Sequence, residues 1–540
     1  MPAGLIIAGL IGTWALSGRA QPTVSKGQNF TASTLKVDSS AVPPDSNGAA
    51  GSAHFVELIN GRFSVYNKAD GVKVKTMTDV SFWTQAGITI PSGWDVTDPR
   101  IIYDPSSQRW FASQVDFDPS GVINTNRFLL AVSTTAYPTD SWQAVAFPTD
   151  PGGNNFADYP TLGLDAQAVY LSGDMFDANG NPVGPSLVSI PKAGLLADPP
   201  VISGLTRFGV LSYTARGDIL QPAICFDGSG QGNILSVASV GIDVSGNFVS
   251  TNKLVSFEVR NTAGSGQATL TGSSFLSVPL YSVPLDPTQP DGSANLDDGD
   301  GRFSAKVYEV GGVLYAVHNT QFTNPAVPPS TQSTNLAALQ WYRIDGNTHA
   351  VLESGTIVDP VMDLFYPSIA ANSAGTVVIA YNGSSINSFV SSFALVGSTV
   401  NGVTTFGAPL LLKAGVASYQ NTDSTGTSRW GDYSATCVDP VDSNRFWTIQ
   451  EFPSSKSAWS TQVTELITSS AVPTPNLSIS ESGNNLVLSW ASTLFNLQTA
   501  SSLATPNWTQ VTQNLSTNNG VVTAAIPASG GQGFFRLQGP

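Results

Sequence analysis

The side chains with the clearest capacity for chemistry in this sequence are aspartates, arginines and tyrosines that recur at similar points along the chain. Three arginines could together clamp a carboxylate through paired hydrogen bonds, and an aspartate beside a tyrosine could act as an acid or as a nucleophile. Each candidate lies just ahead of a short apolar run, or at its beginning. The predicted ligand-binding residues are Asp98, Arg100, Asp158, Tyr159, Arg302, Tyr366, Arg429, Asp432 and Tyr433.

A structural role competes with this interpretation. Aspartates and arginines at the entrances of strands often pair with each other and hold neighbouring sheets together. The sequence contains no G-x-S-x-G elbow, H-E-x-x-H motif or phosphate-binding loop, so the usual signatures of hydrolases, zinc proteases and nucleotide-binding proteins are absent. Structure, ligand binding and catalysis therefore all stay open for these residues.

An acidic segment, DPTQPDGSANLDDGDGR, begins at Asp286 and ends at Arg302. Closely spaced carboxylate and amide oxygens suit Ca²⁺, although the spacing does not match an EF-hand loop. The predicted metal ligands are Asp291, Asp297, Asp298 and Asp300, and calcium is the predicted cofactor. A solvated acidic loop without a metal is the alternative.

The candidates recur because the chain between about residues 45 and 468 repeats one unit. RWGDYSATCVDPVDSNRFWTIQEF, from Arg429 to Phe452, is its fullest copy, and TDPRIIYDPSSQRWFASQVDF and DYPTLGLDAQAVYLSGDMF are earlier copies. Each copy indicates a hairpin of two strands with an Asp/Gly turn, followed by two further strands. Seven such units, roughly 60 to 80 residues apart, predict a seven-bladed β-propeller. A long two-sheet sandwich is the alternative, but sandwiches do not normally repeat one motif in this way.

Three residue types occupy fixed places in the unit. Prolines are expected at the start of the first strand, where a missing N–H is tolerated: Pro99, Pro160, Pro222 and Pro367. Large aromatics are expected in the second strand, between neighbouring sheets: Trp110, Tyr170, Tyr315 and Trp447. Aspartates are expected at the hairpin turns, bonded to the next backbone N–H groups: Asp104, Asp165, Asp227 and Asp439. Cys225 and Cys437 fall in first strands of units that are not neighbours, so both are predicted to be free buried thiols.

Residues 1–20, MPAGLIIAGLIGTWALSGRA, carry an apolar run that is too short for a membrane span and fits a signal peptide. An N-terminal segment, 21–44, is expected to follow, and then the propeller, 45–468. Residues 469–485 form a Pro/Ser-rich linker, and residues 486–540 predict a small C-terminal β-sandwich. The protein is thus expected to be all-β and to have two folded domains.

The composition narrows the choice of partners and compartment. The net charge of −15 disfavours nucleic acid, whose phosphates require clustered Lys and Arg. No segment after the signal peptide reaches eighteen apolar residues, so no transmembrane span is predicted in the mature chain. We expect the protein to be secreted or extracellular. It is then either associated with the cell surface or released from it.

Two resemblances add to this interpretation. RWGDYSATCVDPVDSNRFWTIQEF, LDDGDGRFSAKVYEVGGVLYAVHNT and DPRIIYDPSSQRWFASQ resemble segments of secreted bacterial propeller proteins grouped with sialidase-type (BNR-like) folds. The sialidase Asp-box, S-x-D-x-G-x-T-W, is absent, which argues against sialidase activity. FNLQTASSLATPNWTQV followed by GFFRL resembles a C-terminal β-sandwich module of large secreted bacterial proteins. That resemblance implies surface association or sorting.

These observations favour a binding protein that recognises a glycan or an extracellular protein at the mouth of the propeller channel. A glycoside hydrolase or lyase that uses the Asp/Arg/Tyr ring is the first alternative. A structural surface component is the second, because charged residues are only 11% of the sequence and its polarity comes from uncharged side chains.

Overall fold

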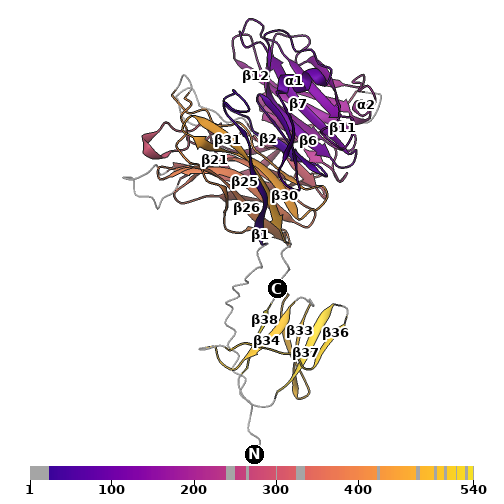
Figure 1. The fold of residues 1–540 in the computed structure, drawn as a ribbon. Coiled ribbons are helices and arrows are strands. Elements are labelled where there is room, and N and C mark those ends of the chain that lie inside the picture. Colours follow the sequence, from indigo (N-terminus) through magenta and orange to yellow (C-terminus); the bar gives the residue numbers. More distant parts are fainter. Residues whose placement is uncertain are drawn as a thin grey trace, which may run out of the picture. The chain divides into compact units, whose positions relative to one another are not determined.

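The computed structural model describes residues 23–238, 250–262, 267–299, 301–323, 335–422, 426–469, 475–491, 495–503, 507–518, 520–528 and 533–538. The chain divides into two compact units, of which one is Thr23–Ser470 and the other contains Ala471–Pro540. The predicted signal peptide and the predicted metal ligand Asp300 lie outside the described residues. Strands dominate both units (Figure 1).

The larger unit is a succession of antiparallel sheets in chain order. The first sheet contains β2 (Asn47–Ala50), β3 (His54–Ile59), β4 (Arg62–Asn67) and β5 (Lys73–Met77). The second contains β6 (Asp95–Asp104), β7 (Arg109–Phe117), β8 (Arg127–Ser133) and β9 (Trp142–Pro148). The next contains β10 (Phe156–Leu164), β11 (Ala168–Phe176), β12 (Pro182–Pro191) and β13 (Thr206–Val210). It is followed by β14 (Asp218–Pro222), β16 (Asn233–Val237) and β17 (Thr251–Arg260), which β18 (Thr269–Leu270) and β19 (Ser274–Tyr281) both join.

The succession continues to the end of the unit. A further sheet contains β20 (Tyr308–Val310), β21 (Val313–Thr323), β22 (Asn335–Asp345) and β23 (Val351–Ile357). The short β15 (Ile224–Cys225) pairs in parallel with both β10 and β20 and joins their sheets into one of nine strands. Then follow β24 (Asp363–Ala371), β25 (Thr376–Ser385) and β26 (Ser388–Val400), with β27 (Val403–Phe406) and β28 (Leu410–Lys413) on β26. The helices are short: α1 (Asp79–Gln85), α2 (Lys192–Leu195), α3 (Tyr213–Arg216) and the 3₁₀ turn η1 (Pro290–Gly292).

The last sheet joins the two ends of the unit. It contains β29 (Ala435–Val438), β30 (Arg445–Ser455), β31 (Ala458–Thr468) and, antiparallel to β31, β1 (Val24–Thr34). Figure 1 shows the indigo β1 among the orange strands of this sheet. β1 lies in the 21–44 segment that the sequence analysis placed ahead of the propeller. The strand therefore belongs to the sheet system itself.

The first strands of the sheets pack against one another in a closed cycle. β2 contacts β6, β6 contacts β10, β10 contacts β14, β15 pairs with β20, β20 contacts β24, β24 contacts β29, and β29 contacts β2. Radial repetition of small antiparallel sheets with their first strands inside is the β-propeller arrangement. Because β1 completes the last sheet, strands from both ends of the unit hold the cycle closed.

The hairpin turns are built by aspartates, as the sequence predicts. Asp104 accepts hydrogen bonds from the backbone N–H groups of Ser106 and Ser107 at 3.1 and 3.3 Å. Asp439 accepts one from Val441 N–H at 2.9 Å and one from the buried Trp447 Nε1 at 2.9 Å. The carboxylate thus fixes the turn and anchors the aromatic side chain of the next strand. Cys225 and Cys437 are free and buried, also as predicted.

The predicted position of the prolines is wrong. Pro99, Pro160 and Pro367 lie inside β6, β10 and β24, at interruptions of the pairing register, and not at the first residue of each strand. A β-bulge leaves one residue outside the hydrogen-bond ladder, so proline is tolerated there although it has no N–H. The strands accordingly begin several residues earlier than the sequence pattern suggested.

Two sheets are found in the described residues of the smaller unit. One consists of β32 (Ser478–Ser482), β33 (Asn485–Trp490), β37 (Val521–Pro527) and β36 (Leu515–Asn518), and the other of β35 (Thr509–Gln510), β34 (Asn496–Ala500) and β38 (Phe534–Gln538). Leu488 and Trp490 from the first sheet share one apolar cluster with Leu497 from the second. Across the part of the chain that the structure describes, none of the helices has the length and apolar character that crossing a membrane requires.

A cavity of about 230 Å³ lies where the first strands end. Ala50, Ile102 and Cys437, from β2, β6 and β29, line it together with Lys306, which precedes β20. The Lys306 amine is buried and donates to the backbone carbonyls of Gly48 and Ile101 at 3.2 and 2.6 Å. Burial lowers the pKa of this amine from 10.5 to about 7.

The buried Lys306 amine should make the free energy of unfolding depend on pH. Between pH 7 and 10.5 the unfolded chain binds the proton that folded Lys306 has lost, so stability rises with pH in that window. Relative to Lys306→Met, the wild-type free energy of unfolding should increase by about 3 kcal/mol between pH 7 and 10. Urea denaturation of both proteins across this range measures the difference. Lys36→Met, at an exposed side chain, is the control, and a pH-independent difference between wild type and Lys306→Met would contradict the prediction.

Candidate functional site

The site is positioned by unusual backbone at the beginning of the first strands. Asp98, Tyr159 and Tyr366 lie in the bulges of β6, β10 and β24 and have φ values of +60°, +51° and +45°. Asp45, just ahead of β2, has a φ of +52°. Left-handed backbone is uncommon for residues other than glycine, and a bulge redirects a side chain out of the regular alternation of a strand.

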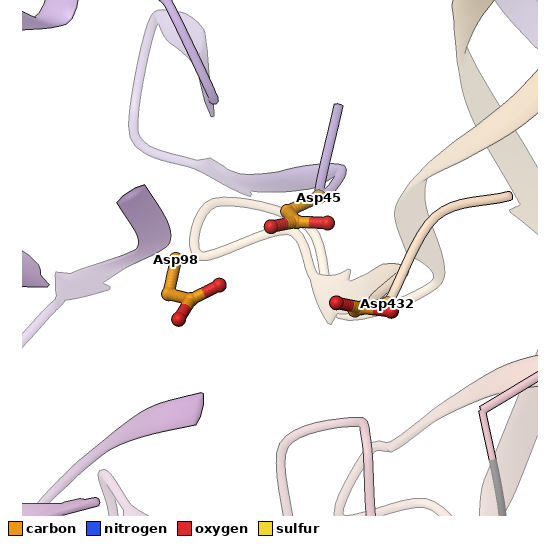
Figure 2. A group of neighbouring side chains, drawn as sticks. All are labelled: Asp45, Asp98 and Asp432. Carbon is orange, nitrogen blue, oxygen red and sulfur yellow. The ribbon is translucent and has the colours of Figure 1, made fainter. Parts of the chain in front are cut away.

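Three carboxylates meet at this end of the cycle. One oxygen each of Asp45, Asp98 and Asp432 lies within 4.8 Å of the other two, and Figure 2 shows the three groups facing a common space. Asp45 is 2% exposed and Asp98 is 5% exposed, whereas the Asp432 side chain is 20% exposed. Two of the carboxylates are thus enclosed by protein, and Asp432 forms the side of the cluster that is nearest to solvent.

The enclosed carboxylates are held by few hydrogen bonds. Asn60 donates from Nδ2 to Asp45 at 2.7 Å, and its Oδ1 accepts the backbone N–H of Asp98 at 3.1 Å. The backbone N–H of Tyr159 donates to Asp98 Oδ2 at 3.2 Å. One asparagine therefore fixes both Asp45 and Asp98, and so ties the first two sheets together at this point.

Burial and mutual repulsion raise the pKa of all three carboxylates. For Asp98 burial is the largest cause, followed by the charges of Asp158 and Asp45. For Asp45 burial is again the largest cause, followed by the charge of Asp432. Burial raises the pKa of Asp432 to about 6, although Arg429 opposes the shift. The cluster therefore favours protons or another cation over three bare negative charges.

The three predicted arginines do not share one role. Arg429 forms ion pairs with Asp297 and, at 3.4 Å, with Asp432. Arg302 is half-buried, with its guanidinium 4.8 Å from the centre of the Tyr159 ring. Arg100 is 2% exposed and donates to two backbone carbonyls, of Pro160 at 2.8 Å and of Ser304 at 3.1 Å. Arg302 and Arg429 lie where a ligand can reach them, and Arg100 is enclosed beneath.

The three predicted tyrosines surround the carboxylates. Tyr159 donates its hydroxyl to the backbone carbonyl of Asp432 at 3.1 Å, and its ring packs edge-on against Tyr433 with centroids 4.6 Å apart. Tyr366 and Tyr433 are each 2% exposed. Within the described ranges, the hydroxyl groups of Tyr366 and Tyr433 have no hydrogen-bond partner. Two buried hydroxyls beside the cluster are therefore unsatisfied.

The predicted metal ligands are not brought together in the same way. Asp297 is paired with Arg429, Asp298 is buried, and Asp291 is exposed in η1. In the part of the chain that the structure describes, the acidic, His and Cys side chains close enough to share a cation are Asp45, Asp98 and Asp432 instead. A calcium ion in the 286–302 segment stays a prediction.

Sequence reasoning missed two acidic residues of the site. Asp45 lies just ahead of β2, and the copy of the repeat that follows it, SNGAAGSAHFVELINGRFSVYNK from Ser46, is looser than the others, so this position did not stand out. Glu451, in β30, is 3% exposed and accepts the backbone N–H of Gly431 at 3.1 Å. Burial raises its pKa well above the usual range. Its place inside an apolar strand gave no signal of a site.

Comparisons with known proteins give only distant likenesses. No family model and no curated protein matches the sequence. Among solved structures, the GH93 α-L-arabinofuranosidase of Fusarium graminearum, in complex with arabinobiose, is 9% identical over 81% of this chain and 97% of that chain, with a TM-score of 0.37. A protein of unknown function from Dyadobacter fermentans is 12% identical over 70% and 96%, with a TM-score of 0.36. The α-L-arabinanase of Cellvibrio cellulosa is 10% identical over 69% and 95%, with a TM-score of 0.30. Scores this low carry no argument about function, which rests on the site.

Proposed function

We propose that the protein is a secreted or cell-surface glycan-binding protein, with a seven-bladed β-propeller followed by a C-terminal β-sandwich. The proposal is carried by the polar rim around Tyr159 at the mouth where the first strands begin. Asp158 is exposed there, and Arg302, Arg429 and Asp432 are partly exposed. The charged side chains of this rim can donate hydrogen bonds to the hydroxyl groups of a sugar and accept hydrogen bonds from them.

Binding fits this geometry better than hydrolysis does. A glycosidase needs two carboxyl groups that reach the scissile bond from opposite sides. Asp45 and Asp98 are almost fully covered by protein, so a sugar at the rim contacts Asp432 and Asp158 but not the two enclosed carboxylates. Asp158 and Asp432, which lie on one rim beside arginines, are enough for recognition.

Hydrolysis is the second candidate because of one observation. Asp432 has a pKa of about 6 and is partly exposed, which are the properties of a general acid that works near neutral pH. In that case the Asp158 carboxylate, exposed on the same rim, is the partner that the chemistry requires.

A glycan array together with a polysaccharide-turnover screen tests the proposal on the full chain. We expect binding without turnover, and at least a tenfold loss of affinity in Asp432→Asn, because a hydrogen bond to a charged group contributes about 1.5–3 kcal/mol. Asp70→Asn, at an exposed turn between β4 and β5, is the matched control and should bind normally. Turnover that Asp432→Asn abolishes would replace binding by hydrolysis, and silence in both assays would favour a structural role.

A further inference from the structure

We propose that Asp45, Asp98 and Asp432 form a binding site for a divalent cation, Ca²⁺, at the mouth of the channel. The site is distinct from the acidic 286–302 segment. It is built by three elements that are far apart in sequence: the turn before β2, the bulge in β6 and the segment before β29. The inference concerns a metal alone and does not depend on glycan binding.

The charge balance of the cluster is the first reason. Arg429 pairs with Asp432, but it also pairs with Asp297, so its charge is already shared. Among the described residues, Asp45 and Asp98 form no ion pair. Enclosed carboxylates without a positive partner are strongly disfavoured, and a bound cation is one of the arrangements that neutralises them.

Unsatisfied polar atoms are the second and independent reason. Tyr433 is 2% exposed, and its hydroxyl has no partner within the described ranges. After burial, the charge of Asp98 and, more weakly, that of Asp45 raise the pKa of this hydroxyl, while Arg100 opposes the shift, so the group lies beside the two carboxylates. Asp45 Oδ1 is buried as well, and in the described chain the group beside it is another carboxyl, that of Asp98. Buried polar groups that face a common space without partners indicate a missing ligand.

The spacing suits calcium. Ca²⁺–oxygen distances of about 2.3–2.6 Å place ligands on opposite sides of the ion about 4.6–5.2 Å apart. The three carboxylate oxygens lie within 4.8 Å of one another, so one ion can contact all three without a large movement. Mg²⁺ holds its ligands at about 2.0–2.1 Å and prefers to keep its waters, so it fits the enclosed cluster less well. The side of the cluster beside Asp432 faces solvent, so water or hydroxyl groups of a ligand can complete the coordination of the ion there.

Protons are the competing occupants, and they give the site a testable pH dependence. The raised pKa values of Asp45 and Asp98 mean that the metal-free cluster holds protons to higher pH than ordinary carboxylates do. Ca²⁺ must displace these protons, since the ligands bind in their ionised form. Apparent affinity for Ca²⁺ should therefore increase as the pH rises from 5 to 8, a range in which Asp432, with a pKa of about 6, also loses its proton. The charges that act on Asp432 from around the cluster are those of Arg429, Asp297, Asp158 and Arg302.

Calorimetric titration of the EDTA-treated, dialysed full chain with CaCl₂ tests the site. We expect saturable binding that Asp98→Asn weakens at least tenfold and that Asp70→Asn, at the exposed turn between β4 and β5, leaves unchanged. Loss of binding in Asp291→Asn but not in Asp98→Asn would overturn the assignment, and so would the absence of any saturable Ca²⁺ binding by the wild-type chain.

Thermal unfolding distinguishes a variant that has lost Ca²⁺ binding from one that has failed to fold. Without Ca²⁺, Asp98→Asn should be at least as stable as wild type, because it removes a repelling charge. With Ca²⁺ in excess, Tm should rise for wild type and for Asp70→Asn but not for Asp98→Asn or Asp45→Asn. Equal increases in Tm for all four proteins would place the ion elsewhere. Because the probe is Ca²⁺ alone, a protein that binds Ca²⁺ but no glycan contradicts only the proposed function.

Discussion

Glu57→Leu should lower the free energy of unfolding of the larger unit by about 3–5 kcal/mol. Glu57 lies in β3 of the first sheet and is fully buried. Its carboxyl group accepts hydrogen bonds from Ser33 in β1 at 2.6 Å, from Thr461 in β31 at 2.5 Å and from Tyr66 in β4 at 3.1 Å. One side chain therefore joins the first sheet to both strands at the closing edge of the last sheet.

The loss is large because leucine fills the volume but accepts no hydrogen bond. Three buried hydroxyl groups lose their acceptor, and each must find another or remain unsatisfied. Glu57→Gln keeps one acceptor oxygen and replaces the other by an amide donor, to which a rotated hydroxyl can adapt. We expect it to lose only about 1 kcal/mol. Urea denaturation followed by tryptophan fluorescence measures both variants, and equal stability of Glu57→Leu and wild type would show that closure does not depend on this group.

The local parts of the fold could be predicted from the sequence, and its closure could not. Asp104 and Asp439 shape their turns through bonds to residues two and three positions away, so the pattern is visible within a few letters. β1 pairs with β31 although contacting residues such as Ser33 and Thr461 are 428 positions apart. The sequence of β1, VSKGQNFTAST, contains no feature that identifies the strand with which it pairs. The cycle of sheets closes because β1, from the beginning of the unit, pairs with β31, from its end. A repeat pattern predicts a propeller but not which strand makes this pairing.

The same division applies to the candidate site. Asp98, Tyr159 and Asp432 follow the repeat, and because equivalent positions meet around a cycle of first strands, the sequence could place them near one another. Arg429, a candidate ligand-binding residue, forms an ion pair with Asp297, a candidate metal ligand that lies 132 positions away in the sequence. No local rule predicts such a pairing. The bulges also escaped the sequence pattern, although they decide where Asp98 and Tyr366 point.

Arg100→Met should lower the free energy of unfolding by about 3–5 kcal/mol, because two buried backbone carbonyls lose their charged donor. Its guanidinium donates to Pro160, in the bulge of β10, and to Ser304, ahead of β20, and lies 3.6 Å from the centre of the Tyr433 ring. The side chain thus links β6 to two other parts of the cycle, and methionine leaves both carbonyl oxygens without their donor.

Arg100→Lys separates the structural role from ligand recognition. Lysine keeps the positive charge but lacks the planar fork, so it can satisfy one of the two carbonyls and should lose about 1–2 kcal/mol. Arg100 is enclosed, so a folded Arg100→Lys protein should bind glycan with wild-type affinity, whereas Asp432→Asn should not. Urea denaturation and glycan titration on the same preparations provide both values. If Arg100→Lys kept wild-type stability but bound glycan more weakly, Arg100 would belong to the ligand-binding residues. The ligand would then have to reach a side chain that is enclosed in this structure.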